Sequence, residues 1–185
     1  MNTVILDGFN CENPFSKYLT KQLAAKGEVF SVFRLKDMNI LPCTSCGSCG
    51  CQTPGQCVIK DDMSQILRAM ASSKVMILLT KVRFGGYSSL LKKAMDRTMP
   101  IGLPFYIKED GHLLHSMRYG RKHIIAIGML PQQNHPGHEQ NFRRLVAANA
   151  LNMQSSCSAL LLKPTDDLAV TEKELDFLLD EVKKI

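Results

Sequence analysis

Five short apolar runs recur along the chain, and they constrain its fold more than any other feature. Each run is rich in Val, Ile or Leu, without the strict alternation expected of a strand that has one solvent-facing side. Near-continuous hydrophobicity is typical of strands buried on both faces of a parallel sheet. The five runs are TVILDG, EVFSVFRL, KVMILLT, KHIIAIGM and SSCSALLLK. The sequence therefore predicts a parallel sheet of five strands.

Amphipathic segments follow each of these runs. The first should be a helix capped by Asn13 with Pro14 at its first position, and the last should open with a capping box of Thr171 and Glu174. The apolar residues expected to face the sheet are Phe15, Tyr18, Leu19, Leu23, Met63, Ile66, Leu67, Met70, Leu90, Leu91, Ala94, Met95, Phe142, Leu145, Val146, Ala150, Leu175, Leu178, Leu179 and Val182. Alternation of strand and helix predicts an α/β fold with a doubly wound sheet.

Length and composition indicate one domain. At 185 residues, 45% of them hydrophobic, the chain can form one well-cored unit. We expect a single domain over residues 1–185, with a Cys-rich loop at 41–60 and a hairpin-like insertion at 100–121. Because we find neither a signal peptide nor an apolar stretch of roughly 20 residues, we expect a cytoplasmic protein with no membrane partner.

The net charge of +6 is modest. It favours anionic ligands such as nucleotide phosphates. Lys and Arg are interleaved with Asp and Glu instead of forming a dense stripe, so we expect no nucleic-acid partner.

Three loops should form the binding edge of such a sheet. Ligands of doubly wound folds bind where loops leave the carboxyl ends of the strands, beside strand one. The loops in question are 8–16, 80–89 and 128–138. The middle one contains TKVRFGGYSSLLKKAMDR.

This middle segment resembles the flavodoxin-like NAD(P)H-dependent FMN reductases, particularly the branch that includes the iron-sulfur flavoproteins. In those proteins a segment of the form T-P-V-x-F-G-x-x-S precedes a Lys-bearing helix and wraps the flavin ring. Further similar segments are CVIKDDM at 57–63, LKKAMDRTMPIGLPF at 91–105 and NFRRLVAANALNM at 141–153. The resemblance implies a flavodoxin-like sheet in the order 2-1-3-4-5, FMN as cofactor and NAD(P)H as cosubstrate.

The middle loop is the expected contact for the flavin ring. Gly85 and Gly86 permit the close backbone approach that a flat ring requires. Lys81 stands where the family usually has proline, and Arg83 could place positive charge near the ring. The alternative is a tight strand-to-helix turn without a ligand. The expected cofactor-binding residues of this loop and the next are Thr80, Val82, Arg83, Phe84, Gly85, Gly128 and Met129.

The first loop, GFNCENPFS, departs from the family pattern of G-S-P followed by G-N-T. A Ser is replaced by Phe9, Pro14 removes an amide donor, and Glu12 adds negative charge. We expect weaker phosphate anchoring than in typical relatives, and the alternative is a degraded site on a retained fold. The expected cofactor-binding residues of this loop are Gly8, Phe9, Asn10, Asn13 and Ser16.

Five of the seven cysteines lie within residues 41–57. Cys43, Cys46, Cys49 and Cys57 form C-x2-C-x2-C-x7-C, which matches the compact motif of iron-sulfur flavoproteins. Four thiolates suit a [4Fe-4S] cluster, but tetrahedral zinc accepts the same set, and free or disulfide-forming cysteines are a third reading. Cys51 is expected to be a spare thiol, not a ligand.

The segment FYIKEDGHLLH contains Asp-Gly between two apolar runs, which predicts a hairpin. We expect a homodimer with Ile101, Leu103, Phe105 and Tyr106 near its interface. The histidine pairs at 112 and 115 and at 135 and 138 are interpreted as surface and loop residues.

Together these features predict an FMN-dependent oxidoreductase. It would pass electrons from NAD(P)H or a reduced protein donor to a small acceptor or electron carrier, through an iron-sulfur cluster if the cysteines hold one. No protein acid-base residue is required, because the flavin supplies the redox chemistry. The alternative is a redox- or metal-sensing module with a degraded flavin site.

Overall fold

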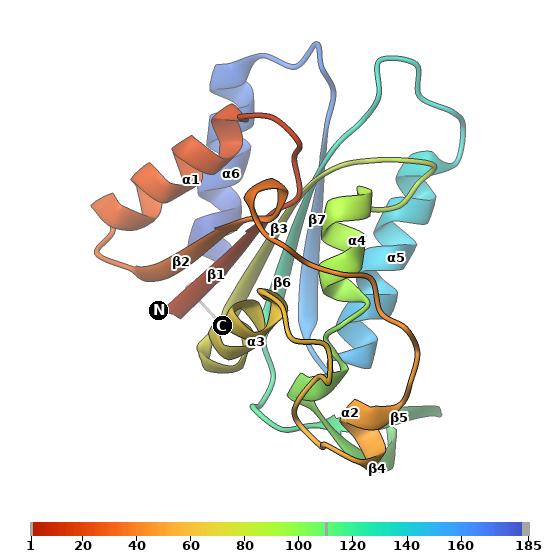
Figure 1. Cartoon of the computed structure of the whole chain (residues 1–185). Coiled ribbons are helices and arrows are strands. Elements are labelled where there is room, and N and C mark those ends of the chain that lie inside the picture. Colours follow the sequence, from red (N-terminus) through yellow and green to blue (C-terminus); the bar gives the residue numbers. More distant parts are fainter. Residues whose placement is uncertain (1, 110, 183–185) are drawn as a thin grey trace.

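The computed structural model describes residues 2–109 and 111–182, and its centre is a five-stranded parallel sheet. The strands lie in the order β2-β1-β3-β6-β7, which confirms the predicted flavodoxin-like arrangement (Figure 1). Each strand coincides with one of the apolar runs. Their bounds are β1 Asn2–Asp7, β2 Val29–Arg34, β3 Val75–Lys81, β6 His123–Met129 and β7 Ser156–Leu162.

Helices cover both faces of the sheet. The helices α1 and α6 pack on one face against side chains such as Ile77 and Ile127, whereas α3, α4 and α5 pack on the other face against Leu78 and Ala126 (Figure 1). Neighbouring strand residues therefore enter different cores, as the two-residue period of a strand requires. The bounds are α1 Pro14–Ala25, α2 Ser48–Cys51, α3 Met63–Ser72, α4 Ser89–Met95, α5 His138–Asn152 and α6 Leu168–Val182, with short 3-10 turns η1 Leu35–Asp37 and η2 Met99–Ile101.

Strands β2 and β7 are less buried than the sequence predicted. Both stand at the edges of the sheet, and most of their residues are partly or fully exposed, whereas β3 and β6 are almost entirely buried. Val29 of β2 is mostly exposed. An edge strand lacks one neighbour, so its apolar composition does not guarantee burial on both faces.

The first helix begins as predicted, but the last does not. The side chain of Asn13 accepts a hydrogen bond from Ser16 N at 2.8 Å and caps α1. Helix α6 starts at Leu168, so Thr171 lies inside its first turn and the predicted capping box is wrong. The carboxylate of Asp167 caps it instead, accepting from Ala169 N at 2.7 Å. The predicted contact of the Val182 side chain lies outside the described part of the chain.

A two-stranded antiparallel hairpin follows α4, as the sequence predicted. Its strands are β4 Gly102–Glu109 and β5 His112–Met117. The hairpin lies beside α2, at the end of the molecule opposite the carboxyl edge of the sheet (Figure 1). Within it, the ring of His115 stacks on Tyr106 at 4.2 Å and its Nδ1 is 2.9 Å from Leu103 O. These contacts make His115 a structural residue of the hairpin.

Candidate functional site

The carboxyl edge of the sheet gathers the three loops that the sequence singled out. In Figure 1 the loops after β1, β3 and β6 all leave the upper end of the sheet, the first toward α1 and the other two toward α4 and α5. A cleft of about 350 Å³ opens there between the first loop, Lys81 and Met129. Of the predicted cofactor-binding residues, Phe9, Asn13 and Met129 line this cleft. Its remaining lining residues are Cys11, Glu12, Pro14, Phe15, Lys163, Pro164, Asp166 and Thr171.

The loop after β7 is a part of this cleft that the sequence reasoning missed. Lys163 and Asp166 lie in it, and the carboxylate of Asp166 accepts from Lys163 N at 2.6 Å. The usual rule places ligands beside strand one, whereas β3 and β6 both lie between β1 and β7 in the sheet. The Pro-Thr-Asp-Asp run after β7 was a turn signal that could have directed attention there.

The first loop is held by the chain's own polar groups. The buried carboxylate of Asp7, 5% exposed, accepts from Phe9 N at 3.1 Å. The side-chain amide of Asn13 donates to both carboxylate oxygens of Asp7, at 3.0 and 2.9 Å. Asn13 therefore joins the end of β1 to the start of α1, with its own oxygen on Ser16 N.

One of the cavities at the start of α1 is small, whereas the cleft at Asn13 and Pro14 and a pocket of about 470 Å³ at Ser16 and Lys17 are open. Phe9 is 4% exposed and packs against Phe15, with ring centroids 6.5 Å apart. The cavity between Phe9, Asp7 and Ser16 has a volume of about 10 Å³. A cavity of this size holds about one water molecule.

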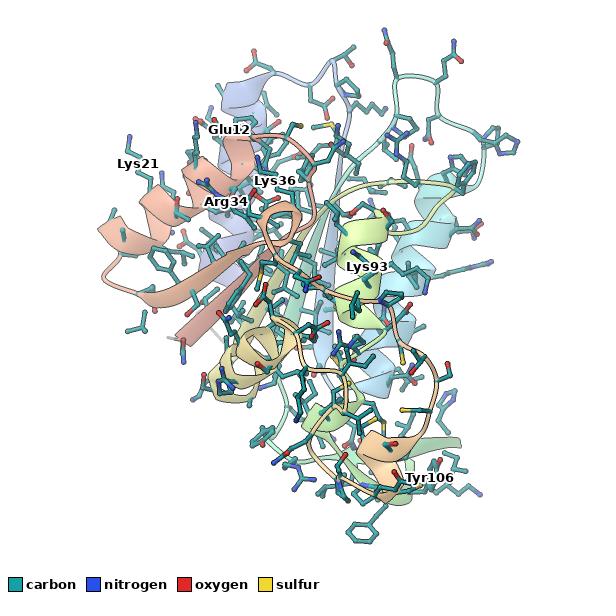
Figure 2. The ribbon with its side chains drawn as sticks, in the orientation of Figure 1. Glu12, Lys21, Arg34, Lys36, Lys93 and Tyr106 are labelled. Atoms are coloured by element: carbon teal, nitrogen blue, oxygen red, sulfur yellow. The ribbon has the colours of Figure 1, made fainter. Side chains whose placement is uncertain are left out.

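Charged side chains around this cavity largely compensate one another. Lys17, Arg34 and Lys36 line it together with Asp7 and Glu12. Glu12 pairs with Lys17 at 2.7 Å. This hydrogen bond and the charges of Lys17, Arg34 and Lys36 hold the pKa of Glu12 below its ordinary value. Figure 2 shows Glu12, Arg34 and Lys36 near the start of α1 and the end of β2.

Several of the predicted binding residues are used for packing instead. A Cβ on Gly8 would lie 2.8 Å from Leu91 Cβ, and one on Gly128 would lie 2.8 Å from Val82 Cγ2. The hydroxyl of Thr80 is buried and accepts from Ser88 N at 2.8 Å. Gly8 and Gly128 leave no room for a side chain, and the hydroxyl of Thr80 is already hydrogen-bonded. These three residues therefore offer no free side-chain group to a ligand.

The middle loop forms a tight turn at residues 83–86. Arg83 N donates to Gly86 O at 2.9 Å, and Gly86 N donates to Arg83 O at 2.8 Å. Phe84 and Gly85 occupy the two central positions with φ angles of 51° and 74°. Gly85 is required, since a Cβ there would lie 2.8 Å from Asn141 Cβ. The turn thus rests on the start of α5.

Phe84 is the most unusual residue of this turn. A positive φ is strained for a bulky residue, and its side chain is 92% exposed. Within residues 2–109 and 111–182, the backbone N–H groups of Phe84 and Gly85 have no hydrogen-bond acceptor. An exposed aromatic ring and two amide donors are therefore displayed together at the carboxyl edge.

Lys81, the residue that replaces the family's proline, links two of the loops. Its Nζ donates to Asn10 Oδ1 at 3.2 Å. Asn10 is thereby held beside Lys81, the last residue of β3, which lines the cleft. Arg83 is exposed and lies on the turn.

These contacts suit the ring end of FMN better than its phosphate end. The ring end has an aromatic face and free amide donors, which suit a flat ring with a polar edge. The phosphate end has a filled cavity, a Pro at the first helical position and a buried carboxylate. A unit of phosphate charge about 4 Å from a carboxylate is repelled by roughly 1 to 4 kcal/mol, depending on screening.

The cysteine loop lies at the opposite end of the molecule. Cys43 and Cys46 are exposed, whereas Cys49 and Cys57 are partly buried. Burial, and then the neighbouring charges of Cys57, Cys43 and Cys46, raise the pKa of Cys49. Those three neighbours are the other members of the predicted ligand set. The hydroxyl and the backbone N–H of Ser48, at the start of α2, lower the pKa of Cys46.

The four thiols lie in one loop but are not gathered into a metal site. In the described ranges, no three His, Cys, Asp or Glu side chains are gathered closely enough to hold a metal ion. The donor set suits iron-sulfur or zinc chemistry, and glycines at positive φ, Gly47 and Gly55, give the loop tight turns.

A buried ion pair closes the base of this loop. Arg97 Nη1 donates to Asp61 Oδ2 and, at 3.0 Å, to Leu41 O, and both side chains of the pair are almost fully buried. The carboxylate of Asp61 also accepts from Leu41 N at 2.8 Å. On the other side, Arg97 Nη2 lies 3.4 Å from Cys57 Sγ and 3.4 Å from Ile59 O. Both ends of the cysteine loop are thus tied to one guanidinium.

Comparison with known proteins identifies the family. The chain matches the NADPH-dependent FMN reductase family over residues 7–160 and belongs to that family. It is 35% identical over 86 residues to an iron-sulfur flavoprotein of Methanocaldococcus jannaschii, covering 46% of this chain and 44% of the relative. It is 33% identical over 92 residues to an iron-sulfur flavoprotein of Methanosarcina thermophila, covering 50% and 47%. The matched region spans about half the length of these relatives.

Solved structures share the fold. An FMN-dependent NADH-azoreductase from Bacillus anthracis, in complex with FMN, superposes with a TM-score of 0.64 at 18% identity, over 97% of this chain and 98% of that one. A putative quinone reductase from Klebsiella pneumoniae gives a TM-score of 0.69 at 12% identity, over 96% and 85%. At such identities the likeness establishes the fold alone. Among the described helices, none has the length and hydrophobicity to cross a membrane.

We predict that Asp61→Asn lowers the free energy of unfolding of the metal-free protein by about 3 to 5 kcal/mol, because Arg97 stays buried without its charged partner. Asp96→Asn breaks the exposed pair with Lys92 and should cost less than about 0.5 kcal/mol. Urea denaturation measures both. Equal losses in the two variants would contradict the role assigned to the buried pair.

The buried ion pair of Asp61 and Arg97 should make the stability of the protein depend on pH. Burial favours the neutral form of Asp61, but the hydrogen bonds from Arg97, Leu41 N and Met63 N outweigh it and hold the pKa below its ordinary value of 3.8. The contribution of Asp61 is therefore complete above that value and is lost as the pH falls through the folded-state pKa. As the pH falls below about 4, wild-type protein should therefore lose more stability than Asp61→Asn does.

Proposed function

We propose that the chain is a flavin-dependent oxidoreductase that takes electrons from NAD(P)H or a reduced protein donor and passes them to a small acceptor. The single observation that carries this is the turn at 83–86, which holds Phe84 in a strained conformation with its ring in solvent. Strain of this kind clusters at functional sites. Membership of the NADPH-dependent FMN reductase family supports the same conclusion.

The flavin, when bound, supplies the hydride and electron chemistry. The chain's own residues bind and orient it. The ring of Phe84 offers an aromatic surface, and the N–H groups of Phe84 and Gly85 offer donors for the polar edge of the ring. Lys81 and Lys163 at the cleft and Arg83 on the turn add positive charge, which favours a reduced, anionic ring.

We predict that Phe84→Gly weakens flavin binding about 5- to 10-fold, the equivalent of one lost aromatic contact. Glycine adopts the positive φ without strain, so the thermal unfolding midpoint should not fall. Phe177→Ala is the matched control, because Phe177 is an equally apolar, exposed aromatic on α6. Quenching of flavin fluorescence measures affinity. The loss of oxidised-flavin absorbance on addition of NADH or NADPH, in the absence of oxygen, measures reduction of the bound flavin.

Three results would count against this function. One is unchanged flavin affinity in Phe84→Gly. Another is bound flavin that neither nicotinamide cofactor nor a chemical reductant can reduce. The third is a wild-type protein that binds no flavin but retains a metal, which would favour the sensing module.

We also propose that Cys43, Cys46, Cys49 and Cys57 hold an iron-sulfur cluster. The support is their C-x2-C-x2-C-x7-C spacing, the anchoring of the loop at Arg97, which contacts Cys57, and the similarity to iron-sulfur flavoproteins. Cubane clusters of this type are commonly held by four cysteine thiolates.

Cysteine substitutions test this proposal in protein prepared without oxygen. Cys46→Ser should abolish iron binding, because one ligand is lost, whereas Cys51→Ser should leave the iron content unchanged. Iron, sulfide and zinc analysis of both variants and of wild type is the measurement. Zinc in place of iron would assign the ligands to a different metal, and freely titratable thiols with no metal would reject the site.

A homodimer assembled through the hairpin is the third part of the proposal. Phe105, Tyr106 and Leu113 are 67%, 62% and 71% exposed, while Ile101, expected at the interface, is buried in the core. The register places Tyr106 and Leu113 on the same face of the hairpin. Tyr106 lies at the far end of the molecule from Glu12 (Figure 2), so such an interface would leave the flavin cleft open.

The change Tyr106→Ser with Leu113→Ser should weaken the dimer more than about 10-fold, because both substitutions remove apolar contact area from the same face. Sedimentation at several protein concentrations measures the effect. Phe177→Ser on α6 is the control and should leave the association unchanged. A wild-type protein that sediments as a monomer at micromolar concentration would contradict the proposal.

A further inference from the structure

A second cavity, of about 720 Å³, lies away from the carboxyl edge of the sheet. It is formed by α3, by the end of the cysteine loop and the residues after it, by η2 and by the segment that follows β5. Figure 1 shows α3 and the cysteine loop at the lower end of the molecule. Small-molecule sites commonly have volumes of roughly 300 to 1,000 Å³, so this cavity is large enough for one.

One wall of the cavity is a face of α3. Ser64, Leu67, Arg68 and Ala71 recur at intervals of three and four residues, so they lie on the same side of the helix. All four line the cavity, whereas the buried residues of α3 pack into the core. The helix therefore uses one side for the core and presents another to the cavity.

Much of the remaining lining is apolar. Ile59 comes from the segment after the cysteine loop, and Pro100 and Ile101 come from η2. Tyr119, which is 47% exposed, adds an aromatic ring from the chain after β5. These side chains suit the apolar faces of a ring, which gains contact area and an aromatic neighbour there.

The free charges of the cavity are positive. Lys60 and Arg68 line it, and within residues 2–109 and 111–182 neither of them pairs with a carboxylate. Asp61 also lines the cavity, but its buried carboxylate is paired with Arg97. The guanidinium of Arg118 lies beside the cavity, since a Cβ at Gly55 would be 3.4 Å from its Nη2. An anionic group would therefore meet uncompensated cations.

The carboxyl end of α3 would oppose an anion, because the helix dipole places partial negative charge there. Lys122 reduces this effect. Its buried ammonium group donates to Ser73 O at 2.7 Å and to Ala71 O at 3.5 Å. The helix end next to the cavity is thus covered by a positive charge.

We infer that this cavity is a binding site for a small aromatic anion, whose ring lies against Leu67, Ile101 and Tyr119 and whose acidic group faces Lys60 and Arg68. The site is separate from the cleft at the carboxyl edge, so it does not depend on the proposed function. Cys57 lines the cavity as well, and the bound molecule would therefore lie against the cysteine loop.

Two probes of the same shape test the inference. Naphthalene-2-sulfonate carries the negative charge, and naphthalene-2-methanol is its uncharged counterpart. Isothermal titration of the wild-type protein, without flavin, measures both dissociation constants. The sulfonate should bind with a constant below roughly 1 mM and at least about fivefold more tightly than the alcohol. Equal constants, or no binding of the sulfonate, would overturn the inference whether or not the protein binds flavin.

Removing the two cations should remove the preference for the anion. The change Lys60→Gln with Arg68→Gln should weaken sulfonate binding about 10-fold and alcohol binding less than about twofold. Both side chains are exposed, so the fold should not be affected. Lys81→Gln with Lys163→Gln is the matched control, because it removes the same two charges from the cleft at the carboxyl edge. Loss of sulfonate binding in the control alone would place the probe in that cleft and overturn the inference.

A third variant tests the position of the ring. Tyr119→Ser should weaken the sulfonate and the alcohol by a similar factor of about 3 to 10, because both probes lose the same aromatic contact. Phe177→Ser removes an exposed aromatic ring from α6 and should change neither constant. Unchanged binding of both probes in Tyr119→Ser would contradict the placement of the ring in this cavity.

Discussion

The buried pair of Asp61 and Arg97 is the interaction on which the cysteine end of the molecule depends. One guanidinium holds carbonyl groups from residues before and after the loop and also contacts Cys57. Arg97 follows α4 directly, and Ser88, which caps the other end of α4, donates to Gly8 O at 2.7 Å. A single short helix is therefore attached to the flavin loop at one end and to the cysteine loop at the other. The two candidate sites share one rigid support.

The family fold is retained here, and the residues at its carboxyl edge differ in what fixes them. Gly8, Thr80 and Gly128 are fixed by packing, so they would be kept whether or not a ligand binds. The residues that distinguish this chain, Phe9 and Asn13, act in the first loop. The similarity to the family therefore describes the scaffold. The identity of the ligand depends on the side chains at the carboxyl edge.

Much of the fold could be predicted from local sequence. The apolar runs and the Asn13 cap depend on interactions between residues close together in the chain. The wrong start of α6 shows the limit of this approach, since both Asp167 and Thr171 are good caps and only the path after β7 decides between them.

The site was harder to predict. Arg97 looks like a surface charge in sequence, and its partner Asp61 is distant along the chain. A buried ion pair can be recognised only when tertiary structure brings both groups out of water.

The interlock of Asp7, Phe9 and Asn13 couples the end of β1 to the start of α1. Asp7 accepts hydrogen bonds from Phe9 N and from the side chain of Asn13, which also caps the helix. Loss of Asn13 would remove this cap, at a cost of about 1 kcal/mol. It would also take from the buried carboxylate of Asp7 the one donor that serves both of its oxygens. One substitution would therefore loosen the strand end, the loop and the helix together.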